Sequence, residues 1–192
     1  MGDPPIPVAQ AIFMDETVQI SDQLRIENTN DLLAHSLALE LEASERYAEL
    51  SEQMQTHNNL EVAELFLELS RIEKLHMERV LEQAALRNVK DISASKYQWE
   101  YPEGPETTNL EEAHYLMTPH HALQLALHNE KRAGDFFTRI AAAATDGDVA
   151  HLATEMAAEE QEHVSLIEEW LTRYPEPDDD WSDDPDPPVG RD

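Results

Sequence analysis

The sequence contains no cysteine, which excludes disulfides, iron–sulfur clusters, thiolate-bound zinc and cysteine nucleophiles. It is also poor in basic residues, with 13 Lys and Arg against 41 Asp and Glu and a formal net charge of -28. Nucleic acids and anionic membrane surfaces would repel such a chain, so we expect neither as a partner. This charge balance instead suits a protein that gathers cations.

The sequence also lacks a basic leader and a long apolar run. The first 25 residues hold a single basic side chain, Arg25, so we expect no secretory or transit signal. No stretch is apolar enough to span a bilayer. At 192 residues, the chain is long enough for one domain with a substantial core. We therefore expect a cytoplasmic protein.

Four stretches have apolar residues at the spacing of amphipathic helices. Thr29 or Asn30 could be the N-cap of the first helix, and Thr118 with Pro119 forms a favourable start for the third. The predicted helices span about 29–54, 61–87, 118–144, and from the turn at 145–148 to about 173.

The remaining segments flank or connect the predicted bundle, which spans residues 29–173. Residues 1–28 begin with several prolines and show no sustained periodicity of apolar residues, which predicts an extended N-terminal arm. The connection at 88–117 lacks a long helical pattern, and its aromatic residues and prolines predict an ordered strap packed on the bundle. Residues 174–192 are almost entirely Pro, Asp and Glu apart from Trp181, which predicts a disordered acidic tail.

An acid and an imidazole lie three residues apart on the inward face of the second helix, at Glu73 and His76. Positions i and i+3 share a helix face, so both side chains point toward the core. An ionisable pair there is costly unless something compensates it. The arrangement recurs at Glu160 and His163 on the fourth helix. A Glu-x-x-His on each of two helices is half of a carboxylate-bridged di-metal site.

The first and third helices supply the other half. Glu40 and Glu130 lie on inward stripes, and an aromatic residue, Tyr47 or Phe137, follows each glutamate by seven residues. Each turn lies midway between the glutamates of its helix pair, so antiparallel pairing brings all of these side chains to one depth. The predicted metal ligands are Glu40, Glu73, His76, Glu130, Glu160 and His163.

This ligand set favours two iron ions, with manganese as the alternative. Four carboxylates balance the charge of two divalent ions, and the lack of sulfur argues against softer metals. Paired metals at about 3.5–4 Å can hold dioxygen or peroxide between them. We expect Glu73 and Glu160 to bridge the metals and Glu40 and Glu130 to be terminal ligands.

Two hairpins joined by one long crossover predict an all-α, ferritin-like four-helix bundle. The order Glu-x6-Tyr, Glu-x-x-His, long gap, Glu-x6-Phe, Glu-x-x-His resembles the rubrerythrin branch of the ferritin-like di-iron proteins over about residues 30–172. The resemblance implies two bound irons and the coupling of ferrous iron oxidation to reduction of peroxide or dioxygen. A peroxidase of this kind would need an external electron donor.

The chain departs from that family in two ways. Typical rubrerythrins append a cysteine-ligated rubredoxin iron as electron donor, which a chain without cysteine cannot do. They also carry an extra glutamate three residues after the third-helix ligand, where this chain has Ala133. A simpler ferroxidase or iron-handling role therefore gains weight over the family's peroxidase mechanism, in which one iron shifts between ligands.

Two classes of function remain open from the sequence. The first is a di-iron oxidoreductase for iron handling and protection against oxidative stress, which acts on ferrous iron, peroxide or dioxygen. The second is an iron-binding or iron-delivery protein in which turnover is incidental. A di-iron hydroxylase is a third option, but it would need an apolar pocket and a docking face for a reductase. We also expect a homodimer or a larger homo-oligomer.

Other residues have simpler interpretations. A third Glu-x-x-His, from Glu111 to His114, lacks a partner hairpin, and we interpret it as a chance match. Tyr47 could pack in the core, or it could form a hydrogen bond or quench a radical near the metals. The remaining histidines are expected at the surface or as helix caps: His35, His57, His120, His121, His128 and His151.

Overall fold

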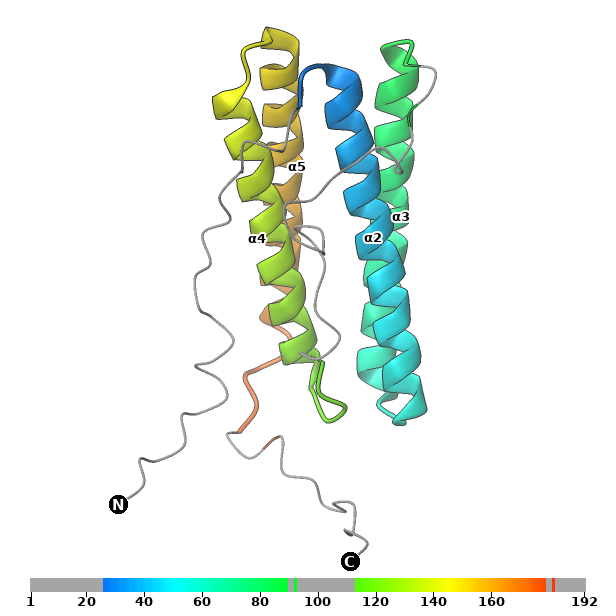
Figure 1. Cartoon of the computed structure of the whole chain (residues 1–192). Coiled ribbons are helices and arrows are strands. Elements are labelled where there is room, and N and C mark those ends of the chain that lie inside the picture. Colours follow the sequence, from blue (N-terminus) through cyan, green and yellow to red (C-terminus); the bar gives the residue numbers. More distant parts are fainter. Residues whose placement is uncertain (1–25, 90–91, 93–112, 179–180, 182–192) are drawn as a thin grey trace, which may run out of the picture.

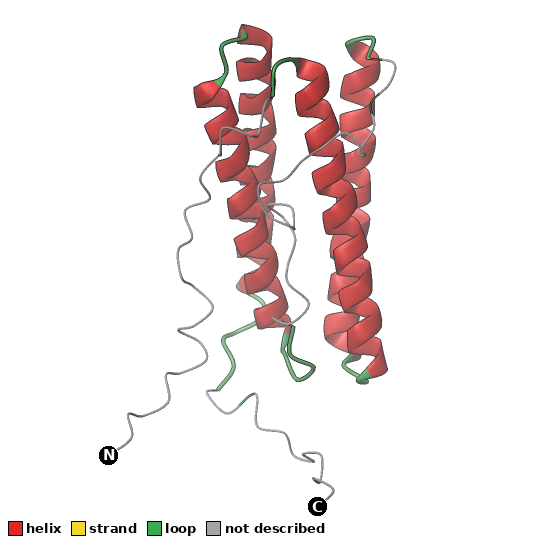
Figure 2. Ribbon diagram, viewed as in Figure 1, coloured by secondary structure: helices red, strands yellow, loops and turns green. Residues whose placement is uncertain are grey.

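The computed structural model describes residues 26–89, 92, 113–178 and 181, and these residues contain four long helices. The helices are α2 (Thr29–Thr56), α3 (Leu60–Leu86), α4 (Pro119–Ala143) and α5 (Gly147–Leu171). Helices α2 and α3 form one antiparallel hairpin and α4 and α5 form a second beside it (Figure 1). No strand occurs among the described residues (Figure 2). The predicted all-α bundle is confirmed.

The helix ends lie within two residues of the predicted positions, but the cap of α2 differs from the prediction. Asn28, and not Thr29 or Asn30, is the N-cap, and its side-chain oxygen accepts hydrogen bonds from the backbone N–H groups of Asn30 (2.9 Å) and Asp31 (3.1 Å). Asp146 caps α5 in the same manner. Each cap satisfies backbone donors that have no partner within the helix.

Helices α3 and α4 run in the same direction (Figure 1). Their connection must therefore return along the length of the bundle, which is the single-crossover topology of ferritin-like proteins. Most of the predicted strap, and nearly all of the predicted N-terminal arm, lie outside the described residues. Within the described ranges, no helix is long and apolar enough to cross a membrane.

The core consists of two apolar clusters with the predicted ligands between them. One cluster contains Phe66 and Leu123, and the other contains Phe137 and Leu152. The first half of α2 is enclosed on every side, because all nine residues from Leu32 to Glu40 are buried. Apolar packing above and below thus shields the ligand layer from water.

The C-terminal segment contacts the bundle where the structure describes it. His120 Nδ1 donates a hydrogen bond to the Tyr174 carbonyl oxygen (2.9 Å). The Trp181 ring lies 3.9 Å from the His121 ring and 5.5 Å from the His114 ring, measured between ring centroids. The predicted disorder of the tail concerns mostly residues that lie outside the described ranges.

Truncation after Tyr174 tests whether the tail matters to the centre of the bundle. We expect unchanged helical content and unchanged metal content, because no predicted ligand lies beyond that residue. Loss of the half-buried Trp181 should cost about 1 kcal/mol, or roughly 2–4 °C in melting temperature. Circular dichroism and elemental analysis measure these properties, and Trp181→Ala in the full chain should reproduce the lower melting temperature. Loss of metal on truncation would contradict this account.

Candidate metal centre

The six predicted ligands form two groups of three, one on each hairpin. The groups are Glu40, Glu73 and His76 on α2 and α3, and Glu130, Glu160 and His163 on α4 and α5. Within each group, one nitrogen or oxygen atom per residue lies within 4.8 Å of the others. Each hairpin therefore carries one complete set of two carboxylates and an imidazole.

In the first group, His76 lies between two carboxylates. Its Nδ1 atom is 3.0 Å from Oε2 of Glu73 and 3.5 Å from Oε2 of Glu40. The Glu40 Oε2 atom is fully buried and makes no hydrogen bond in the described part of the protein. A buried carboxylate oxygen without a donor is costly. This atom therefore indicates that a ligand, such as a metal ion, belongs at the site.

The second group repeats the arrangement on α4 and α5. The Nδ1 atom of His163 lies 3.1 Å from Oε2 of Glu160 and 3.2 Å from Oε2 of Glu130. The i, i+3 spacing on α5 brings Glu160 and His163 onto one face, as the sequence predicts. The antiparallel pairing of α4 with α5 adds Glu130 to the same layer.

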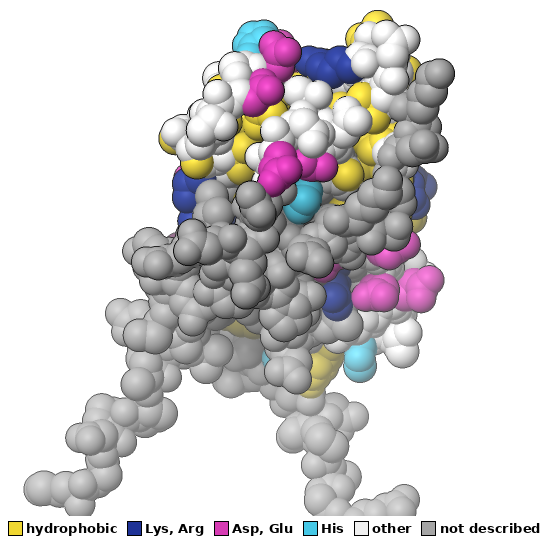
Figure 3. Space-filling view, turned by 45° about the horizontal axis from the view of Figure 1, so that its top comes forward, with side chains coloured by type: hydrophobic (Ala, Val, Ile, Leu, Met, Phe, Trp, Pro, Cys, Tyr) yellow, Lys and Arg dark blue, Asp and Glu magenta, His cyan; other side chains and the backbone are white. Residues whose placement is uncertain are grey.

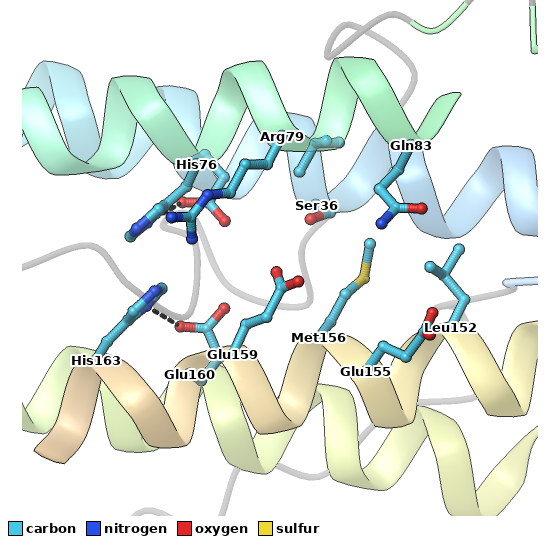
Figure 4. A pocket seen from close by; sticks show the side chains of 12 residues that line it. Ser36, His76, Arg79, Gln83, Leu152, Glu155, Met156, Glu159, Glu160 and His163 are labelled. Carbon is cyan, nitrogen blue, oxygen red and sulfur yellow. Dashed lines mark hydrogen bonds and ion pairs between the residues drawn. The ribbon is translucent and has the colours of Figure 1, made fainter. Parts of the chain in front are cut away.

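The two groups face each other between the hairpins. The imidazole rings of His76 and His163 are parallel, with centroids 4.0 Å apart and an interplanar angle of 3°. Figure 4 shows both rings pointing into the gap between α3 and α5. All four glutamates are at most 4% exposed, so four carboxyl groups share one water-poor layer. Nitrogen and oxygen donors of this kind suit iron or manganese.

Burial changes the protonation of this layer. Burial raises the pKa of Glu40 well above its usual range, and the neighbouring charge of Glu73 adds to the effect. Burial also raises the pKa of Glu73, and it raises that of Glu160 to about 7. Although burial lowers the pKa of the His163 imidazole, hydrogen bonds and charge interactions with Glu130 and Glu160 raise it to about 11. Without metal, protons therefore compensate the clustered carboxylates.

Position 133 does not supply a seventh ligand. Ala133 is fully buried, three residues after Glu130 on α4. Among the residues that the structure describes, the two ligand groups contain no further acid or histidine. Within the described ranges, the two groups consist of four glutamates and two histidines.

A small cavity leads from the surface to the ligand layer. It is lined by residues of α2, α3 and α5, including Glu40, His76 and His163. The exposed side chains of Arg79 and Glu159 also line it (Figure 4). The centre of a water-sized molecule has about 20 Å³ of free space there. One water needs about 10–15 Å³ by this measure, so the cavity has room for about one water-sized molecule.

Tyr47 packs in the core and also forms a hydrogen bond. It is 1% exposed and its ring stacks on Phe66 with centroids 6.0 Å apart. Its hydroxyl oxygen also accepts a hydrogen bond from Nδ2 of Asn129, at 3.2 Å. Asn129 was not predicted from the sequence, although a polar side chain directly before a ligand on a buried helix can indicate a residue that interacts near the centre.

The other histidines do not join the ligand groups. The prediction for His35 is wrong, since this residue is buried within α2. Its Nδ1 atom donates a hydrogen bond to the Asp31 carbonyl oxygen one turn earlier (2.8 Å). His121 does help to cap α4, since its Nδ1 accepts a hydrogen bond from the Thr118 N–H (3.2 Å). His114, from the third Glu-x-x-His, belongs to neither group, and Glu111 lies outside the described residues.

The raised pKa values predict how the stability of the metal-free protein depends on pH. A carboxyl with a raised pKa stabilises the fold fully below its usual value, near 4.5, and loses that contribution as pH rises through the raised value, about 7 for Glu160. His163 acts in the same direction between 6.5 and about 11. The melting temperature of metal-free protein should therefore fall from about pH 5 to about pH 8.

Thermal melts in a chelator and at high salt, which screens surface charges, measure this trend. Glu160→Gln cannot titrate, so that variant should show a shallower slope. Metal-loaded protein should show the opposite slope, because metal binding requires deprotonated ligands. A melting temperature of metal-free protein that rises across this pH range would contradict the assignment of the buried carboxylates.

Comparison with known proteins agrees with the geometry. Residues 31–119, which include Glu40, Glu73 and His76, match the family model described as Rubrerythrin. The chain is also similar to an uncharacterized conserved protein from Magnetospirillum magnetotacticum MS-1, whose crystal structure is known. The two share 36% sequence identity, and their structures superpose with a TM-score of 0.56. The match covers 79% of this chain and 98% of that chain. Among curated proteins, none matches significantly. The chain belongs to the rubrerythrin family of ferritin-like proteins.

Proposed function

We propose that the protein is a di-iron oxidoreductase that couples oxidation of ferrous iron to reduction of peroxide or dioxygen. The observation that carries this proposal is the pair of facing Glu, Glu and His groups in one buried layer. The bound irons would supply the electrons for this chemistry, and manganese is the alternative metal. The cytoplasmic location, the homo-oligomer and the external electron donor stay predictions from the sequence.

The protein groups would hold the metals in distinct roles. Glu73 and Glu160 are proposed to bridge the two ions, and Glu40 and Glu130 to be terminal ligands. The buried Glu40 Oε2 atom accepts no hydrogen bond from the described residues, which supports a ligand role for that residue. The raised pKa of His163 means that its imidazole would release a proton when a metal binds. The carboxyls that are protonated in the metal-free protein would do the same.

The size of the cavity supports a small oxidant. Dioxygen and peroxide are close to water in size, whereas the organic substrate of a hydroxylase needs a larger apolar pocket. The buried ligand layer would also keep bulk water away from the reacting groups. For Tyr47, the hydrogen bond to Asn129 favours a hydrogen-bonding role near the centre over packing alone.

The alternative is an iron-binding or iron-delivery protein that oxidises iron only incidentally. Steady-state oxidation of ferrous iron, followed with peroxide or dioxygen consumption, separates the two. An oxidoreductase should oxidise many irons per chain, while a binding protein should stop at the number of ions that it holds. A single turnover in the presence of excess substrate would overturn the enzymatic proposal.

Reconstituted protein should hold two transition-metal ions per chain, with iron preferred. The six ligands form two groups, and each group is complete enough to hold one ion. Elemental analysis after anaerobic loading and desalting measures the ratio. Protein that retains no metal, or less than one ion per chain, would contradict the proposed site.

Replacement of a proposed bridging ligand tests whether the two ions depend on each other. In Glu160→Ala, both ions should bind more than about 100-fold more weakly, since even outer-shell changes cost 10–100-fold, and ferrous oxidation should collapse. Metal-free stability should hold or rise, because the change removes one buried carboxylate from a repelling set.

Glu162→Ala is the matched control for this experiment. Glu162 lies two residues further along α5 and is exposed. Its removal should leave metal affinity, oxidation and stability nearly unchanged. Equal losses in Glu160→Ala and Glu162→Ala, or no loss in either, would mean that the site is wrongly placed.

A further inference from the structure

A buried hydrogen bond connects the two hairpins beside the metal ligands. Asn129 is 2% exposed and immediately precedes the ligand Glu130 on α4. Its Nδ2 atom donates to the hydroxyl oxygen of Tyr47 on α2, at 3.2 Å. Tyr47 is 1% exposed, so water cannot readily replace this contact. The interaction is therefore strongly directional and well shielded.

The position of Tyr47 brings its hydroxyl group back toward the ligand layer. Tyr47 follows Glu40 by two helical turns, about 10 Å along α2. Helical side chains lean toward the N-terminus of their helix, which for Tyr47 is the direction of Glu40. The hydroxyl thus reaches a partner at the level of Glu130. The bond joins α2 to α4 close to one ligand from each hairpin.

The separation of the two ligand groups depends on how the hairpins are placed relative to each other. Each group lies entirely within one hairpin, and the stacked rings of His76 and His163 bring the two groups into contact. The apolar clusters hold the hairpins together, but apolar attraction is non-directional. The glutamates of both hairpins are buried in one layer, so their carboxylates repel each other when charged. A buried hydrogen bond near the layer restricts the register of the two hairpins, because it is directional.

We infer that Asn129 is a positioning residue of the metal centre that acts through Tyr47. The amide–phenol hydrogen bond fixes the register of the two hairpins, and the register sets the separation of the two ligand groups. This inference rests on the proposed di-metal function. It assigns to Asn129 a role in the geometry of the centre in addition to satisfying its own buried amide.

Manganese(II) bound to the full-length protein provides a direct readout of that separation. Two manganese ions held about 3.5–4 Å apart are magnetically coupled, and their electron paramagnetic resonance spectrum differs from the six-line signal of isolated ions. Tyr47→Phe removes the acceptor with almost no change in volume, and Asn129→Leu removes the donor. Both variants should bind two ions, with an altered coupled spectrum and a second-ion dissociation constant raised about tenfold.

Two further variants show whether the effect passes through this hydrogen bond. The double variant should be no worse than either single variant, because both changes break the same contact. Asn129→Gln, which keeps an amide donor, should restore part of the wild-type spectrum. A double variant with the sum of two independent losses would overturn the assignment of Asn129 to Tyr47.

Ser70→Ala is the matched control within one hairpin. The Ser70 hydroxyl donates to the Ser44 carbonyl oxygen at 2.9 Å, and this buried bond joins α2 to α3 without crossing to the other hairpin. The variant should lose stability but keep the wild-type coupling. Tyr47→Phe and Asn129→Leu spectra that match those of Ser70→Ala would overturn the positioning role. Wild-type protein that binds no coupled pair would contradict the di-metal function itself.

Discussion

Four carboxyl groups are buried in one layer between the two hairpins, where they repel each other when charged. Each of these glutamates is at most 4% exposed, so water solvates their charges poorly. Charge there has to be neutralised by protons or by metal ions. The raised pKa values of Glu40, Glu73 and Glu160 favour neutralisation by protons in the metal-free protein. The nitrogen and oxygen donors suit neutralisation by iron or manganese ions.

The division into two hairpins gives this constraint a structural consequence. Each hairpin carries half of the ligand layer, so repulsion across the layer opposes the docking of one hairpin on the other. Apolar clusters on both sides of the layer oppose that separation. Metal ions bound between the groups would strengthen the same interface, because binding to the folded state alone adds to stability. On the face shown in Figure 3, the acidic side chains of the described residues lie at several separate places and not in one patch. The net charge of -28 therefore attracts cations to the molecule as a whole.

Much of this architecture could be predicted from the sequence, because helical periodicity and the i, i+3 spacing are local properties. The turns midway between Glu40 and Glu73, and between Glu130 and Glu160, were enough to place the ligands at one depth. The cap at Asn28 was missed because it and the next two residues are all capable caps. The bond from Asn129 to Tyr47 and the burial of His35 depend on which elements lie alongside, which periodicity does not specify. The small cavity depends on side-chain packing in the same way.

Anomalous diffraction at the iron absorption edge, from crystals loaded anaerobically with ferrous iron, would locate the metal ions. We expect two iron peaks about 3.5–4 Å apart in the buried layer. One should lie against Glu40, Glu73 and His76, and the other against the corresponding residues of the second hairpin. A single peak, or iron bound only to exposed carboxylates with the buried layer empty, would contradict the proposed di-metal site.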